Sequence, residues 1–116
     1  MDPRFQQALD FANYQNTFST QKRILKEKLE AKLIYGYGGG IFKIDNSLLT
    51  FVQMLVDNDK IENVPILDKE GNPVMVENMT EFKDAVFSRY FDATNEYVFS
   101  FNDLKAKRSV EKIVSA

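Results

Sequence analysis

The chain has 116 residues, of which 44% are hydrophobic and 28% are charged, and its formal net charge is −2. These values are typical of one globular domain with a packed core. The chain contains no cysteine and no histidine. This excludes disulfides, thiolate nucleophiles and the usual general base near neutral pH. The nearly balanced charge also argues against a protein whose whole surface binds nucleic acid.

We expect a soluble, cytoplasmic protein without enzymatic activity, cofactor or transition metal. No apolar run is long enough to span a bilayer, and the first residues, MDPRFQQALD, lack the basic and apolar regions of a signal peptide. Histidine and cysteine, the commonest catalytic and metal-ligating side chains, are missing. Of the metal sites, the composition permits only a site for magnesium or calcium made of carboxylates.

Residues 4–32 are expected to be helical, because good helix formers dominate the segment QKRILKEKLEAKL. A stripe with seven-residue spacing continues the pattern toward the N-terminus: Phe11, Phe18 and Leu25. The segment NYQNTFST favours helix less strongly, and Thr17 or Ser19 is suited to cap a new helix there. The sequence is therefore compatible with either one bent helix or two separate helices.

The segment YGYGGGIFKID predicts a β-hairpin, because aromatic and β-branched residues flank three consecutive glycines. A phosphate-binding loop places its glycines between a strand and a helix, whereas strands are expected here on both sides. We therefore interpret Gly38–Gly40 as a turn that needs positive φ. Gly36, inside the first strand, indicates a bulge or a close backbone approach.

Helical spacing returns in the segment DNSLLTFVQMLVDND, where either Asp45 or Ser47 can act as the N-cap. The apolar face of this helix is expected to contain five residues: Leu48, Phe51, Val52, Leu55 and Val56.

The segment VPILDKEGNPVMVE predicts a second hairpin with strands at Val64–Leu67 and Val74–Val76. In its turn, Gly71 and Asn72 are expected to take positive φ. A long helix follows over residues 79–106. Its main face is expected to contain Phe82, Val86, Tyr90 or Arg89, Ala93, Tyr97 and Leu104, and its second stripe Phe87, Phe91 and Val98.

The expected order of elements is α–ββ–α–ββ–α, followed by a last short helix capped by Ser109. Because sequential hairpins pair antiparallel, we expect an α+β fold with one small sheet of about four strands and helices on one face. A single hairpin is marginally stable, so the two hairpins should join into this sheet or each should pack on a helix. The whole chain, residues 1–116, is expected to be one domain. Within it, residues 1–32 form a helical region and residues 33–116 form the hairpin–helix–hairpin–helix core.

The segment from residue 57 to residue 70 is acidic. The spacing of Asp57 and Asp59 resembles the start of a calcium-binding loop, but glycine and the terminal glutamate are missing at the required offsets. The acidic side chains are therefore interpreted as solvated loop charges without metal or catalytic function: Asp57, Asp59, Glu62, Asp68 and Glu70.

Two helical segments are basic, KRILKEKLEAK and KAKRSVEK, and each has a net charge of +3. We interpret them first as solvated helix ends, where cations favour the dipole. If the two segments meet in space, they form one patch that suits nucleic acid or an acidic protein. The residues expected in nucleic-acid contacts are Lys22, Arg23, Lys26, Lys105, Lys107 and Arg108, with Tyr35 and Tyr37 stacking on bases.

Aromatic residues are frequent, with 10 Phe and 5 Tyr, and the first helix is long for such a small sheet. We therefore expect part of its apolar stripe to dock on another chain, either a second copy or a different protein. The residues expected at this interface are Phe11, Tyr14 and Phe18. The function expected is that of a non-enzymatic interaction or assembly protein, with nucleic-acid binding as the alternative.

A resemblance to a known family of proteins rests on four segments: GGGIFKID, ILDKEGNPVMVEN, RYFDATNEY and LKAKRSVEKIV. Over residues 33–114 the chain resembles small proteins encoded by T4-like marine phages, especially cyanophages. That family has no assigned activity, so the resemblance implies no functional residue. It implies a protein that works in the cytoplasm of an infected bacterium or in the virion.

Overall fold

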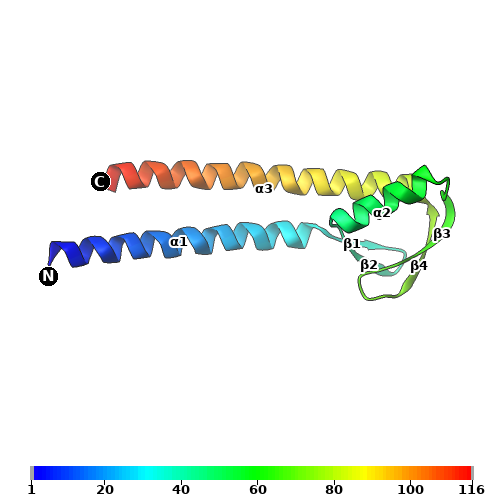
Figure 1. The fold of residues 1–116 in the computed structure, drawn as a ribbon, viewed down its shortest axis with the longest axis horizontal. Helices are drawn as coiled ribbons and strands as arrows, with labels where there is room; N and C mark the ends of the chain where they lie inside the picture. Colours follow the sequence, from blue (N-terminus) through cyan, green and yellow to red (C-terminus); the bar gives the residue numbers. More distant parts are fainter. Residues whose placement is uncertain (1, 116) are drawn as a thin grey trace. The chain divides into compact units, whose positions relative to one another are not determined.

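The structure, a computed structural model, describes residues 2–115, with side chains described from residue 2 to residue 107. The order of elements is α–ββ–α–ββ–α (Figure 1), which confirms the expected α+β class. The elements are α1 Pro3–Lys32, β1 Ile34–Tyr37, β2 Gly40–Lys43, α2 Asn46–Asp57, β3 Glu62–Leu67, β4 Pro73–Asn78 and α3 Met79–Ser115.

The chain divides into two compact units. We call Met1–Lys28 together with Glu96–Ala116 the helical unit, and Leu29–Asn95 the α/β unit. The boundaries of the units fall inside α1 and α3. They therefore differ from the boundary at residue 32 that the sequence suggests.

Both long helices are continuous. α1 is a single helix, which decides between the two alternatives that the sequence leaves open. The hydroxyl of Thr17 donates to the carbonyl of Asn13 at 2.8 Å, a bond to the preceding turn that does not cap a new helix. α3 runs without a break to Ser115, so the separate last helix expected to begin at Ser109 does not exist.

The first hairpin closes through a two-residue turn. β1 and β2 pair antiparallel, and Tyr37 and Gly40 form the last pair before the turn. The two turn residues, Gly38 and Gly39, have φ of 58° and 82°. Positive φ at both central positions is the geometry of a type I′ turn, which suits the twist of the flanking strands. The predicted turn is therefore confirmed for Gly38 and Gly39, whereas Gly40, expected in the turn, is the first residue of β2.

The close backbone approach in this hairpin lies at Gly40 and not at Gly36. Gly36 pairs regularly with Ile41, and a Cβ added at Gly36 would meet nothing nearer than the Gly40 carbonyl oxygen at 3.9 Å. A Cβ added at Gly40 would lie 2.5 Å from Cγ2 of Val74. The expectation of a bulge or close approach at Gly36 is therefore wrong, because the second hairpin packs against the other end of the turn.

The second hairpin pairs β3 with β4, and Leu67 faces Pro73 at its end. Gly71 has the expected positive φ of 81°, but Asn72 does not have positive φ. The carboxylate of Asp68 closes the turn instead. Its Oδ1 accepts hydrogen bonds from the backbone N–H groups of Glu70 at 2.9 Å and Asn72 at 2.8 Å.

The hairpins form two separate two-stranded sheets and not the single sheet expected. Two hydrogen bonds join them. The Lys69 N–H donates to the Ile41 carbonyl at 2.8 Å, and the Ile41 N–H donates to Oδ2 of Asp68 at 3.1 Å. Because the Asp68 side chain takes the place of a backbone acceptor, the ladder of β2 does not extend into β3.

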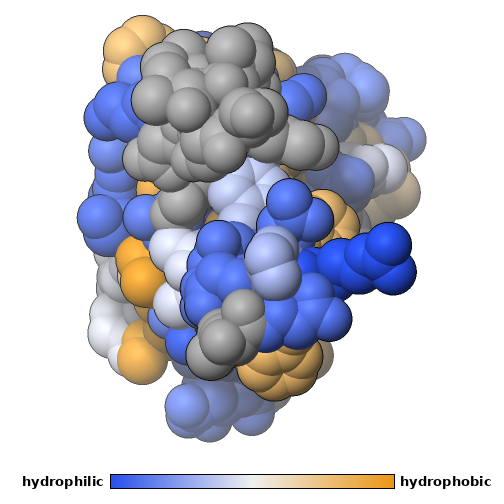
Figure 2. Space-filling model, turned by 90° about the vertical axis from the view of Figure 1, so that its left-hand side faces the viewer, coloured by the Kyte–Doolittle hydropathy of each residue, from blue (hydrophilic) through white to orange (hydrophobic). Residues whose placement is uncertain are grey.

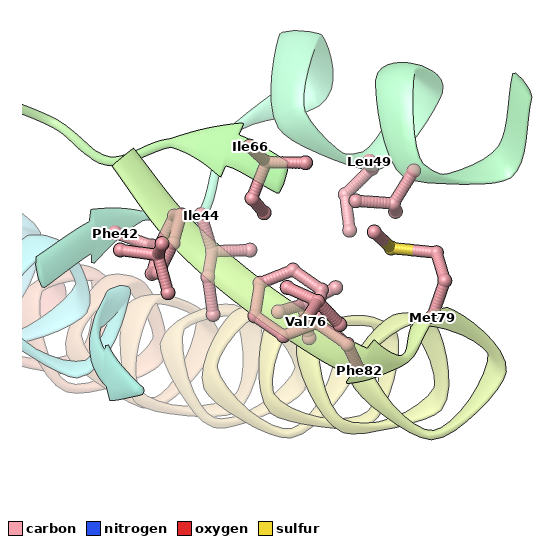
Figure 3. Close-up of a cluster of buried hydrophobic side chains, with 10 residues drawn as sticks. Phe42, Ile44, Leu49, Ile66, Val76, Met79 and Phe82 are labelled. Carbon is pink, nitrogen blue, oxygen red and sulfur yellow. The ribbon is translucent and has the colours of Figure 1, made fainter. Parts of the chain in front are cut away.

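The core of the α/β unit lies between the two hairpins, α2 and the first turns of α3 (Figure 3). Its members are Phe42, Ile44, Leu49, Val52, Ile66, Val74, Val76, Met79, Phe82 and Val86. Asp45 caps α2, because its carboxylate accepts from the Leu48 N–H at 2.9 Å. Phe51, expected inside, is exposed, and Leu49 is buried in its place.

Candidate interaction surfaces

The described side chains contain no group of three carboxylates close enough to hold a metal ion. The acidic segment is held by its own hydrogen bonds: the carboxylate of Asp57 accepts from the Gln53 side chain at 2.8 Å. The amide of Ile41, followed by that of Asn72, donates to the Asp68 carboxylate and keeps its pKa below the usual 3.8. The role of Asp68 is thus to join the two hairpins.

Tyr35 and Tyr37 are half-buried in the α/β unit. Their rings stack on each other at 6.5 Å between centroids, and both contact the buried ring of Phe82 at 6.0 Å and 5.1 Å. The guanidinium of Arg89 lies 5.5 Å from the Tyr35 ring centroid, and its Nε donates to the Lys32 carbonyl at 3.0 Å. Both rings thus already pack against aromatic neighbours of the α/β unit, which makes them less available for stacking on bases.

In the helical unit, α1 presents large apolar side chains to solvent, and no described residue of this helix is buried. Of the three expected interface residues, Phe11 is 58% exposed, whereas Tyr14 and Phe18 are half-buried. Phe5, on the same helix, is 56% exposed. Figure 2 views the side on which Figure 1 draws the termini and shows hydrophobic side chains, in orange, at the surface among hydrophilic ones.

The basic residues of the two helices meet at one aromatic ring of the helical unit. The ammonium nitrogen of Lys22, on α1, lies 6.0 Å from the centroid of Phe101, and that of Lys105, on α3, lies 5.8 Å from the same centroid. Both are within the range of a cation–π contact. The structure therefore brings together two of the six basic residues expected in nucleic-acid contacts.

The other four basic residues expected in nucleic-acid contacts are Arg23, Lys26, Lys107 and Arg108. Arg23 faces Glu27 at 3.7 Å on its own helix, and Lys107 pairs with Asp103 at 3.1 Å. Lys26 is exposed, one turn beyond Lys22. The side chain of Arg108 lies outside the described residues.

A shallow groove of about 360 Å³ runs between the two helices of this unit. Leu25, Leu104 and Phe99 contribute to its lining, and Phe99 is 76% exposed. The apolar spacing of the sequence does not indicate Phe99, because this residue falls outside both apolar stripes of α3. The signal that was available is an isolated aromatic residue on the opposite side of a helix whose main face is already apolar.

No helix in the described part of the chain is long and apolar enough to cross a membrane. Comparison with protein-family models, with curated proteins and with solved structures finds no match to the chain.

Proposed function

We propose that this chain is a non-enzymatic interaction or assembly protein that binds a protein partner through the helical unit. The observation that carries the proposal is the 30-residue helix α1, which has no buried residue in its described length and exposes Phe5 and Phe11 by more than half. A helix in a folded protein is stabilised mainly by packing of its apolar face. A partner that covers these rings supplies that packing.

The exposed residues belong to the types that dominate protein interfaces. Aromatic side chains are enriched at interface centres, and truncating one at a hot spot costs about 2 kcal/mol or more. Phe11 on α1 and Phe99 on α3 are the strongest candidates by exposure. The resemblance to small phage proteins supports a role in the infected bacterium or the virion. We propose that origin together with the function.

Chemical cross-linking inside the cell that makes the protein tests the proposal. A tagged chain is expected to carry an adduct of defined mass, identified by mass spectrometry. Phe11→Ser and Phe99→Ser should each reduce the adduct at least about tenfold, as expected for a hot spot. The matched control is Phe51→Ser, an exposed phenylalanine of α2, which should leave the adduct unchanged. Absence of any adduct, or equal loss in all three variants, contradicts the proposal.

Nucleic-acid binding is the second candidate, and the convergence of Lys22 and Lys105 on Phe101 favours it. Its support is narrower, because Tyr35 and Tyr37 pack against Phe82. A gel shift with a single-stranded oligonucleotide at low and moderate salt tests it. A real complex must weaken steeply as salt rises, because counterion release drives phosphate binding.

A further inference from the structure

The two units of the chain carry charge of opposite sign. The helical unit contains nine Lys and Arg against six Asp and Glu, a net charge of +3. The α/β unit contains six Lys and Arg against eleven Asp and Glu, a net charge of −5. The overall value of −2 therefore conceals two strongly charged parts, each complementary to the other part in another molecule.

In the helical unit the positive charge is concentrated in what we call the basic cluster, Lys22, Lys26 and Lys105. Two of its ammonium groups lie within 6.0 Å of the centroid of Phe101. None of the three has a carboxylate partner among the described side chains, whereas Arg23 and Lys107 do. Cations held close together repel one another, so an external anionic group near them lowers the electrostatic energy.

In the α/β unit the exposed surface of the β3–β4 hairpin and its turn has the complementary character. Leu67 is 67% exposed and Met75 is more than half exposed on this hairpin. The hairpin also carries three exposed glutamates without an ion pair to any described side chain: Glu62 and Glu77 on its strands and Glu70 in its turn. We call this surface the acidic hairpin face. It combines apolar area, which gives affinity, with charge, which gives orientation.

We infer that the partner of the helical unit is a second copy of this chain, whose acidic hairpin face docks on the basic cluster and the exposed side chains beside it. The inference rests on the proposed function and names its partner. Association of two copies brings the positive unit of one against the negative unit of the other, and closed twofold pairs are the commonest oligomers. The apolar side chains that meet in this arrangement are Val98 and Phe99 on one copy, and Leu67 and Met75 on the other.

A polyanion such as nucleic acid fits this distribution less well. Three unpaired lysines neutralise about three phosphates, fewer than the roughly six to ten contacts of proteins with strong salt-dependent binding. The exposed leucine, methionine and phenylalanine side chains have no role in phosphate recognition, because nucleic-acid interfaces are more polar than protein interfaces. The net −5 of the α/β unit also repels a long polyanion.

Light scattering on the purified full chain tests the inference. Wild type at about 0.05 M sodium chloride should show twice the chain mass of 13.4 kDa. It should return to the chain mass at about 1 M salt, where the screening length falls to about 3 Å. Two charge-reversed variants test whether the basic cluster and the acidic hairpin face are the surfaces that bind each other. The first is Lys22→Glu, Lys26→Glu and Lys105→Glu; the second is Glu62→Lys, Glu70→Lys and Glu77→Lys.

Each variant alone should be monomeric, because its two units then carry like charge. An equimolar mixture should recover the doubled mass, because each reversed surface finds its reversed complement in the other variant. Circular dichroism confirms that both variants remain folded. A monomeric wild type at low salt, association that salt does not weaken, or a mixture that stays monomeric overturns the inference.

These outcomes are distinct from failure of the proposed function. A monomeric wild type that still forms the Phe11-dependent adduct in cells keeps the proposed function and replaces the partner. A monomeric wild type that shifts a single-stranded oligonucleotide, with the shift lost in the lysine-reversed variant, assigns the basic cluster to nucleic acid.

Discussion

Gly40→Ala is expected to destabilise the fold through a single steric contact. The added Cβ would lie 2.5 Å from Cγ2 of Val74, and 3.2 Å from both Cβ and Oδ2 of Asp68. Carbon atoms in contact prefer about 3.5–4.0 Å, so one of the two must move by about 1 Å. Val74 is buried in the core and, being β-branched, has few alternative rotamers.

Overpacking of this kind costs about 1–3 kcal/mol. It exceeds the roughly 0.4–1 kcal/mol that a glycine-to-alanine change contributes by restricting the unfolded chain. In urea unfolding followed by circular dichroism, the midpoint should fall by about 1 M, since the slope for a small domain is about 1–3 kcal/mol per molar.

Gly36→Ala is the matched control, because it lies in the same hairpin and its Cβ would meet nothing within 3.9 Å. It should be neutral or slightly stabilising. Val74→Ala removes the atom that Gly40→Ala strikes, so the double variant should be less destabilised than the sum of the single variants by about 1–2 kcal/mol. If Gly40→Ala is as stable as Gly36→Ala, or if the double variant is additive, the packing of the two hairpins described above is wrong.

Three further predictions test the fold. Asp68→Asn should lower the urea midpoint at pH 7. Because the folded-state pKa of Asp68 is depressed, its carboxylate contributes fully to the free energy of unfolding above the unfolded value of 3.8. This contribution disappears as the pH falls through the lower folded-state pKa. The difference from wild type should therefore shrink in acid, and a constant difference refutes the hydrogen-bonded role. Phe82→Ala should cost about 3–5 kcal/mol in the same assay, whereas Phe99→Ala on the same helix should cost less than about 0.5 kcal/mol in the monomer. Asp45→Ala should cost about 1 kcal/mol and Ser47→Ala little, since only Asp45 caps α2; the reverse order would assign the cap to Ser47.

The elements and their order follow from local sequence. The helix α1, the Gly38–Gly39 turn and the strands around Gly71 are each decided within a few residues by periodicity and backbone preference. The candidate interface was predictable in part for the same reason: Phe11 lies on a stripe that the sequence displays, and the structure leaves it exposed.

Contacts between elements were not predictable, because they depend on which surfaces meet. Nothing in the sequence near Gly40 shows that Val74, 34 positions later, packs on it, or that Asp68 joins the hairpins and so keeps the sheets separate. The same holds for Lys22 and Lys105, which only the folded helical unit places at one ring. Local preferences act over a few bonds, whereas these contacts arise from packing and charge between segments distant along the chain, which a single sequence does not encode in any short pattern.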